Sequence, residues 1–386
     1  MSKTFLTASQ ILTGENAVAA AAEILCTFGE KAFIVTGRTV STLPCFLNLT
    51  KTLTEAQIGY EIFQDILGEP DDRMIHAGAE RFKASGCDFL IAMGGGSPLD
   101  AMKAIAVISC CGGEIADYMG KEIQGNLPKM VAIPTTAGTG SEVTQFTIIT
   151  DTATKVKMLL KGRCLVPDLA IVDGANTVSS PKRGTAATAL DALTHAVESY
   201  TSQKAQMLTD GLSLSAIRRI FRWLPVAYND GTNLQARSEL SIAALEAGMS
   251  INNASVTIVH GMSRPIGALF HVPHGISNAM LLTKCMKFAC DGAYGRFAEM
   301  ARAIGAADAQ TGEEEAAKRF LEALQDLCMK CEIPTLEKYG IERNVFFANM
   351  DKMADDAMQS GSPGNTRKEV TKQDILSIYK SLWEEE

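Results

Sequence analysis

Short β-rich runs alternate with helical segments along the first half of this chain, and this alternation constrains the fold more than any other feature. The runs KAFIVTG (31–37), CDFLIAMGGG (87–96) and KMVAIPTT (129–136) are mostly apolar, as strands buried on both faces of a sheet are. A helical pattern at 17–29 precedes the first run, and another at 99–110 lies between the second and the third. Repetition of this kind predicts a parallel sheet with crossover helices.

The alternation stops after DLAIVDG (168–174), the fourth and last predicted strand, and helical periodicity then runs to the end of the chain. A length of 386 residues suits two domains better than one. We therefore predict an α/β domain over residues 1–180 and an all-helical domain over residues 181–386.

Composition argues against several classes of function. The formal net charge of −8 disfavours nucleic acid or an anionic membrane surface as a partner. No apolar run reaches the length of a membrane span, and the first residues lack the pattern of a signal peptide. Ten cysteines without such a signal predict reduced thiols in a cytoplasmic protein.

Four of the five histidines fall between positions 195 and 274, which indicates a shared site. In ALDALTHAVESY, Asp191 and His195 are four residues apart, so a helix would place both on one face. His260 and His274 border a stretch containing Gly and Pro and could complete the group from a second element. One carboxylate and three imidazoles suit a divalent Fe, Zn, Mn or Co ion with an open side. The alternative is a set of ordinary, hydrogen-bonded histidines.

Two glycine-rich loops in the first half suit a ligand that carries phosphate. GGGSPLD (94–100) follows a strand and opens a helix, with Ser97 as the expected N-cap. Its glycines would let the backbone approach a diphosphate at the positive end of that helix. TTAGTGSEVT (135–144) follows another strand and offers hydroxyl groups. Such a turn is also a common structural device, but two of them at the carboxyl ends of strands in one sheet favour a nucleotide site.

The motifs GGGSPLDAMKA, PTTAGTGSEVT, PDLAIVD, ALDALTHAVESYTS and HGMSRPIGALFHVPHG occur in that order. Together they strongly resemble the iron-dependent (group III) alcohol dehydrogenase family. The resemblance implies a dehydroquinate synthase-like architecture, in which an N-terminal dinucleotide-binding domain precedes a helical domain. It also implies a homodimer or a larger homo-oligomer.

The resemblance assigns roles to individual residues. The positions that match the family's metal ligands are Asp191, His195, His260 and His274. The positions that match its cofactor contacts are Gly95, Gly96, Ser97 and Asp100 in the first loop, Thr135, Thr136, Thr139 and Thr144 in the second, and Lys157 near the nicotinamide.

One departure from the family pattern concerns the choice of cofactor. Many members have an aspartate that binds the adenosine ribose 2′-hydroxyl, whereas this chain has Gly37 followed by Arg38. The loss of a carboxylate and the gain of a guanidinium predict good use of NADP(H), alone or together with NAD(H). The alternative is that Arg38 points to solvent and leaves only a weak preference.

A second departure concerns the substrate. Where many members have a histidine four residues after the third ligand, this chain has Arg264, and a histidine stands instead at His271. We expect His271 either to move the hydroxyl proton to solvent or to be a surface residue. Arg264 could hold the carboxylate, sulfonate or phosphonate of a small aldehyde, or it could pair with an acidic neighbour.

These features predict a metal-dependent NAD(P) alcohol dehydrogenase or aldehyde reductase for a small primary alcohol or aldehyde, with Fe²⁺ or Zn²⁺ as the ion. Related alternatives are a glycerol or glycerol-1-phosphate dehydrogenase, a dehydroquinate synthase-like lyase and a reductase of small anionic aldehydes. A non-catalytic metal- or nucleotide-binding protein is an alternative from another class.

Overall fold

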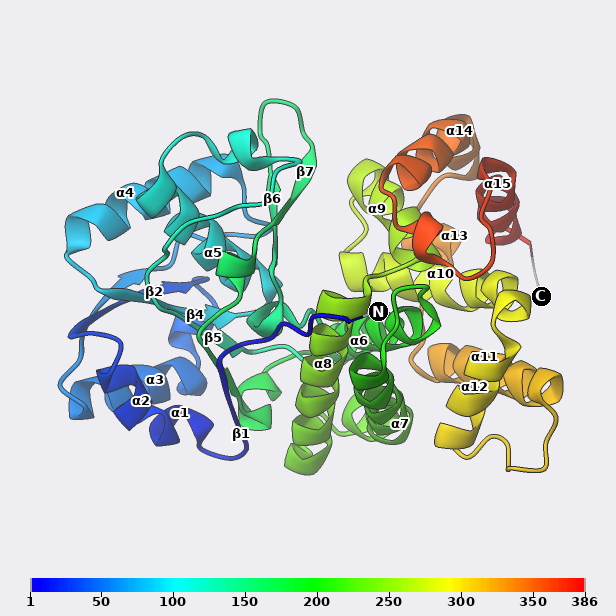
Figure 1. Ribbon diagram of the computed structural model, residues 1–386, viewed down its shortest axis with the longest axis horizontal. Helices are drawn as coiled ribbons and strands as arrows, with labels where there is room; N and C mark the ends of the chain where they lie inside the picture. The colour runs from blue at the N-terminus through cyan, green and yellow to red at the C-terminus, as the bar shows by residue number, and fades with distance from the viewer. Residues whose placement is uncertain (1, 385–386) are drawn as a thin grey trace. The chain divides into compact units, whose positions relative to one another are not determined.

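The computed structural model describes residues 2–384, and the chain folds into two compact units (Figure 1). One unit comprises Leu6–Ser180. The other begins at Pro181 and also includes the N-terminal segment up to Phe5.

The unit of residues 6–180 is built on a parallel sheet of six described strands, in the order β1-β8-β5-β4-β2-β3. Every neighbouring pair in this sheet is parallel. The strands are β1 (Gln10–Thr13), β2 (Lys31–Thr36), β3 (Gly59–Phe63), β4 (Phe89–Gly94), β5 (Met130–Pro134) and β8 (Leu169–Val172). The four strands predicted from apolar runs are therefore present, and β1 and β3 extend the sheet at its two edges.

Helices cover both faces of this sheet because successive side chains of a strand point in opposite directions. Phe33 and Val35 of β2 pack in the core beneath α4 and α5, whereas Ala32 and Ile34 pack in the core beneath α1 and α3. The helices are α1 (Ala17–Ala20), α2 (Ala22–Cys26), α3 (Pro44–Glu55), α4 (Asp72–Ser85) and α5 (Gly96–Cys111). Burial on both faces explains why the central strands are continuously apolar.

Two helix boundaries differ from the sequence-based expectation. The segment 17–29 forms two short helices that meet at Ala21, not one helix. Helix α5 begins at Gly96, so its N-cap is Gly95, and Ser97 lies inside the first turn. The reason is the backbone of Gly94, whose φ of 158° turns the chain directly after β4. The prediction of Ser97 as the N-cap was therefore wrong.

A separate antiparallel hairpin, β6 (Phe146–Thr150) and β7 (Lys157–Lys161), follows the second glycine-rich loop. Met158 and Leu160 of β7 are buried and alternate with exposed residues. The hairpin therefore packs one face against the core beneath α5.

The second unit is helical, and no strand occurs among its described residues. Its helices are α6 (Lys182–Thr201), α7 (Met207–Asn229), α8 (Leu234–Ala254), α9 (Ile258–Phe270), α10 (His274–Ala289), α11 (Tyr294–Ala303), α12 (Glu313–Lys330), α13 (Leu336–Tyr339), α14 (Arg343–Gln359) and α15 (Lys372–Ser381). Helices α7, α8 and α10 pack around α6, and α9 packs against α10 and α14. The predicted combination of a parallel-sheet part and a helical part is confirmed.

No single helix within residues 2–384 is long and apolar enough to cross a membrane. Only α8 and α9 taken together, with a bend of 103° between them, meet those criteria of length and composition.

Candidate metal centre and nucleotide-binding loops

Helix α6 carries Asp191 and His195 one turn apart, as their spacing predicts. Both residues are buried, with exposed fractions of 3% and 4%. Alanines occupy much of the helix surface, which lets α7, α8 and α10 approach it closely. The two side chains are therefore held inside a packed bundle.

His260 lies in the first turn of α9, and His274 is the first residue of α10. The glycine after His274 explains how α10 reaches α6. A Cβ at Gly275 would lie 2.4 Å from a backbone oxygen of α6 and 3.4 Å from Cβ of Asp191. Only a glycine permits this approach, which brings His274 to the carboxylate.

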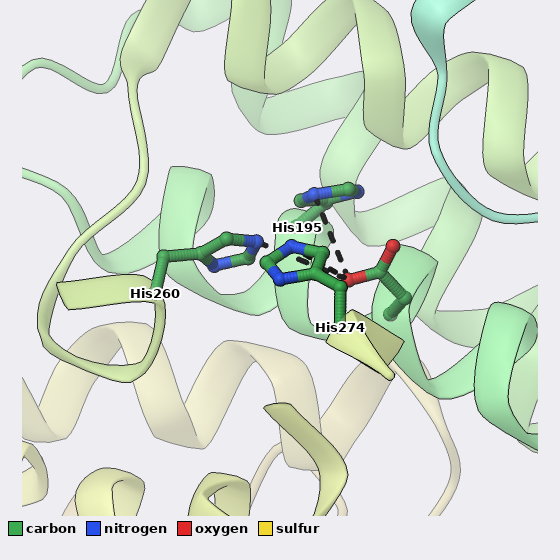
Figure 2. Close-up of side chains that lie close together, drawn as sticks. His195, His260 and His274 are labelled. Atoms are coloured by element: carbon green, nitrogen blue, oxygen red, sulfur yellow. Dashed lines mark ion pairs between the residues drawn. The ribbon is translucent and has the colours of Figure 1, made fainter. Parts of the chain in front are cut away.

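The four predicted ligands converge on one point (Figure 2). One ligand atom from each of Asp191, His195, His260 and His274 lies within 4.8 Å of the others. The Nε2 atoms of the three histidines lie 3.9, 3.9 and 3.7 Å from Oδ1 of Asp191. These distances are too long for hydrogen bonds, but two ligands of one ion lie roughly 3–4 Å apart when each bond is about 2.0–2.2 Å. The arrangement fits one small cation.

Access to this group differs among its members. The side chains of Asp191, His195 and His260 are between 5% and 6% exposed, whereas that of His274 is 39% exposed. The group is therefore open on the side of His274. An open side is the property that separates catalytic metal sites from closed structural ones.

Glu198 is an unpredicted residue of this region, and it has no exposure to solvent. Its Oε2 lies 2.5 Å from Nδ1 of His260. Its Oε1 accepts hydrogen bonds from the Thr257 hydroxyl and from the backbone N–H of Val259, at 2.8 and 2.6 Å. A carboxylate at Nδ1 keeps the ring proton on that nitrogen, so the lone pair of Nε2 faces Asp191.

Asn278 of α10 is the second unpredicted residue. Its Nδ2 donates to Oδ1 of Asp191 at 2.7 Å and lies 3.1 and 3.2 Å from Nε2 of His260 and of His274. The amide has two N–H groups for these three atoms, and an imidazole nitrogen that binds one of them does so as an acceptor. The amide nitrogen therefore lies beside the point on which the four ligand atoms converge.

Sequence reasoning missed both residues for the same reason. Glu198 stands three residues after His195, and Asn278 stands four residues after His274. These spacings place each residue next to a ligand on its helix, but every helix offers such neighbours. Only the tertiary packing shows that these two contact the group.

Burial and charge set the ionisation states in this region. Burial, reinforced by His195 and His274, lowers the pKa of His260 well below its ordinary value and keeps the ring neutral. Burial opposes ionisation of Asp191, but the three histidines and Asn278 hold its pKa below the ordinary value. A neutral imidazole and an ionised carboxylate are the forms that bind a metal ion.

The remaining two candidate residues of the helical unit lie outside the group of four. His271 is exposed and ends α9 in the left-handed region, with φ of 53°. Arg264 lies on α9 one turn after His260 and is half-buried. Its guanidinium interacts electrostatically with Glu198 but forms no hydrogen bond or salt bridge with any residue that the structure describes.

The glycine-rich loops lie at the carboxyl ends of adjacent strands. The segment from Gly37 follows β2, the segment from Gly95 follows β4, and the segment from Thr135 follows β5. The chain leaves β2 toward β3 on one side and returns to β4 on its other side. The carboxyl edge at such a reversal is where open α/β sheets bind ligands.

The first and second loops contact each other. A Cβ at Gly96 would lie 2.9 Å from Cγ2 of Thr139, and one at Gly95 would lie 3.5 Å from Oγ1 of Thr136. Helix α5 has no side-chain cap, so the backbone N–H groups of its first turn, around Ser97, are available to an anion. The two threonines that face the glycines are partly exposed, whereas Thr135 and Thr144 are buried.

Two charged residues of α5 brace the second loop. Asp100 accepts hydrogen bonds from the Ser141 hydroxyl at 2.6 Å and from the backbone N–H of Ile148 at 3.0 Å. Nζ of Lys103, which is fully buried, donates to Oγ of Ser141 and to the carbonyl oxygen of Thr144, both at 2.9 Å. The predicted cofactor residue Asp100 thus has protein partners on both of its oxygens.

Two other predicted cofactor residues form surface ion pairs. Nζ of Lys157 lies 2.6 Å from Glu69, and Nη2 of Arg38 lies 2.9 Å from Asp65. A backbone bridge also joins Gly37 to Asp65. Arg38 therefore has an acidic partner, but the pair lies at the surface, since its two side chains are 66% and 48% exposed.

Comparisons with known proteins cover almost the whole chain. The model of iron-containing alcohol dehydrogenase matches residues 8–174, and that of the C-terminal part of the Fe-containing alcohol dehydrogenase family matches residues 185–383. A 1,3-propanediol dehydrogenase of Klebsiella pneumoniae is 35% identical over 360 residues, which are 92% of each chain. An NAD-dependent methanol dehydrogenase of Bacillus methanolicus is 33% identical over 91% of this chain and 92% of its own. A crystal structure of 1,3-propanediol oxidoreductase has a TM-score of 0.95 and 33% identity, over 99% of this chain and 100% of its own.

Proposed function

We propose that Asp191, His195, His260 and His274 hold the metal ion of this chain, which belongs to the iron-containing alcohol dehydrogenase family. The protein is an oxidoreductase that acts on the CH–OH group of alcohols. The reaction is hydride transfer between NAD(P) and a small primary alcohol or aldehyde. The observation that carries the proposal is the convergence of these four side chains within 4.8 Å.

The donor set fits a divalent ion of the Fe²⁺ or Zn²⁺ type, since it combines one ionised carboxylate with neutral imidazoles. When bound, the ion supplies a Lewis acid for negative charge on the substrate oxygen, and the nicotinamide supplies the hydride acceptor or donor. Glu198 holds the ring of His260 in the tautomer whose Nε2 is free, and Asn278 orients the carboxylate of Asp191.

The loops of the sheet unit are the proposed cofactor site. The backbone at Gly95, Gly96 and Ser97 suits the diphosphate, because side chains are absent there and the N–H groups of α5 are uncapped. Thr136 and Thr139 offer hydroxyl groups beside it. Asp100 and the buried Thr135 and Thr144 support this surface from behind, and Lys157 is proposed to lie toward the nicotinamide.

The proposed cofactor choice is NADP(H), alone or with NAD(H). Gly37 presents no carboxylate to a 2′-phosphate, and Arg38 carries the compensating charge. Its pair with Asp65 is exposed, and exposed pairs contribute only about 0–1 kcal/mol. A phosphate can therefore compete for the guanidinium at low cost.

We propose that His271 exchanges the hydroxyl proton with solvent. It is exposed and lies three residues before His274 in the chain. The test is the rate of alcohol oxidation by His271→Ala, in which kcat should fall at least tenfold because the group that accepts the proton is missing. An unchanged kcat would show that His271 is only a surface residue.

Two further proposals concern the oligomeric state and the cellular location of the enzyme. The family suggests a homodimer or larger homo-oligomer, which light scattering would measure. All ten cysteines are free thiols, which supports a location in the reducing cytoplasm.

The activity is tested by reconstituting the protein with Fe²⁺ or Zn²⁺ and adding NAD⁺ or NADP⁺ with 1-propanol. Growth of the reduced-nicotinamide absorbance is the expected result. A protein that binds metal and nucleotide without changing that absorbance with any short alcohol, diol or glycerol would be a binding protein or a lyase, and the proposal would be overturned.

A further inference from the structure

We infer that Arg264 binds the anionic end of the substrate, so that the preferred substrates are short ω-hydroxy acids or the matching aldehydes with a carboxylate or sulfonate group. The inference rests on the proposed function, because it assigns a substrate class to the same centre. It resolves the two roles that the sequence left open for this residue.

The position of Arg264 is the first step. It follows His260 by four residues on α9, so both side chains leave the same face of the helix. The distance along the helix axis is roughly 6 Å. A short substrate whose anionic end is bound by Arg264 would thus direct its hydroxyl oxygen, a few carbon atoms away, at the four ligands.

The absence of a protein partner is the second step. The other buried or half-buried arginines in the described part of the helical unit all have one. Arg219 pairs with Glu239, Arg296 pairs with Asp210, Arg237 donates to Thr185, and Arg302 donates to backbone carbonyls. Arg264 is half-buried and has no such bond, so its N–H donors can bind a ligand without breaking a contact within the protein.

The charge balance of the region is the third step. Glu198, the carboxylate that interacts electrostatically with Arg264, is already engaged by Thr257, Val259 and His260. Among the described residues, Arg264 therefore has no carboxylate of its own in a hydrogen bond or salt bridge, and an anionic group of the substrate would pair with its charge.

The shape of the donor group favours a flat or multidentate anion. A guanidinium presents parallel N–H donors that match two oxygens of a carboxylate or sulfonate. A neutral alcohol of the same length offers no such partner. The acid should consequently bind more tightly through the end of the molecule that does not react.

The test compares two substrates of matched length, 3-hydroxypropionate and 1,3-propanediol, in the wild type and in Arg264→Gln. We expect the wild type to prefer the acid in kcat/KM, and the variant to lower the ratio of acid to diol about 10- to 100-fold. Arg264→Lys should lower the ratio less, because it keeps the charge but loses the fork. Arg222→Gln, which removes an exposed arginine of α7, is the matched control and should leave the ratio unchanged.

A binding measurement separates recognition from turnover. Calorimetric titration with butyrate and with 1-propanesulfonate should show binding to the wild type that Arg264→Gln weakens at least tenfold. Butyramide, which is uncharged, should bind weakly to both proteins. Free guanidinium ions should restore part of the acid turnover in Arg264→Ala.

The outcomes distinguish this inference from the proposed function. The inference fails if the wild type oxidises the diol without favouring the acid, or if kcat/KM falls equally for both substrates in Arg264→Gln. Arg264 then does not bind the anionic group, but the proposed dehydrogenase activity is still supported. If neither substrate reduces the cofactor while butyrate still binds through Arg264, the proposed function fails and the anion site stands.

Discussion

Oε2 of Glu198 lies 2.5 Å from Nδ1 of His260, and neither residue is more than 4% exposed. The carboxylate thereby fixes which ring nitrogen of His260 faces Asp191. This contact joins the buried charge of α6 to the first turn of α9.

Replacement of Glu198 by Gln should weaken metal binding by about 10- to 100-fold while the fold is retained, because a neutral amide oxygen accepts the hydrogen bond from Nδ1–H of His260 more weakly than a carboxylate does. Competition with a chelator measures the metal affinity directly. Glu246→Gln is the matched control, since Glu246 is a partly buried glutamate that also accepts a hydrogen bond from a hydroxyl group but lies outside the group of four. Equal metal affinity in wild type and Glu198→Gln would show that the contact is only structural.

Cofactor preference should respond to the pair between Arg38 and Asp65. Asp65→Asn frees the guanidinium and should raise the ratio of kcat/KM for NADPH over NADH roughly two- to fivefold, the range for an exposed pair. Gly37→Asp should lower that ratio by introducing a carboxylate. Its Cβ would lie 3.2 Å from the carbonyl oxygen of Ile66, so a small local shift must accompany it. A strong NAD(H) preference in the wild type, or a ratio that falls in Asp65→Asn, would contradict this account.

The sequence predicted the parts of the fold whose pattern is local. Buried strands such as β4 are continuously apolar, and Asp191 and His195 show the helical spacing within a single segment. Edge strand β1 escaped prediction because its four residues are half exposed and its partner, β8, is about 160 residues away.

The unpredicted parts of the site depend on packing between helices. Glu198 reaches His260 only because α6 and α9 meet, and Asn278 reaches Asp191 only because Gly275 lets α10 approach α6. The start of α5 was misplaced because the conformation of Gly94, rather than a polar side chain, begins that helix. Neither the packing between helices nor the backbone conformation of Gly94 can be recognised from the spacing of residue types in the sequence.

Stability of the second loop should depend on Lys103. Lys103→Met removes hydrogen bonds to Ser141 and Thr144 and leaves Asp100 without its buried counter-charge. The free energy of unfolding should fall by about 3–5 kcal/mol, as for other broken buried pairs. Urea denaturation measures this change, and exposed Lys83→Met should stay within about 0.5 kcal/mol of wild type. A loss below about 1 kcal/mol for Lys103→Met would refute the role of this brace.

Glu142 in the same loop should give stability a dependence on pH. Burial raises the pKa of Glu142 from 4.5 to about 7, so the native state keeps a proton that the unfolded chain releases. Stability should therefore fall as pH rises from 4.5 to about 7 and lose nothing further from this group above that range. The side chain at position 142 would not titrate in Glu142→Gln, so the free energy of unfolding of this variant relative to wild type should rise over the same pH range. Parallel curves of unfolding free energy against pH for the two proteins would contradict the assignment.

The most direct test of the metal-dependent mechanism is an anaerobic titration of chelator-treated protein with Fe²⁺, during which the initial rate of cofactor reduction by 1-propanol is recorded. The rate should rise linearly and level off at one ion per chain, and His260→Ala should show no rise although its circular dichroism remains that of a folded protein. A full rate before any ion is added, or an equal rise in His260→Ala, would contradict the claim that Asp191, His195, His260 and His274 form the catalytic centre.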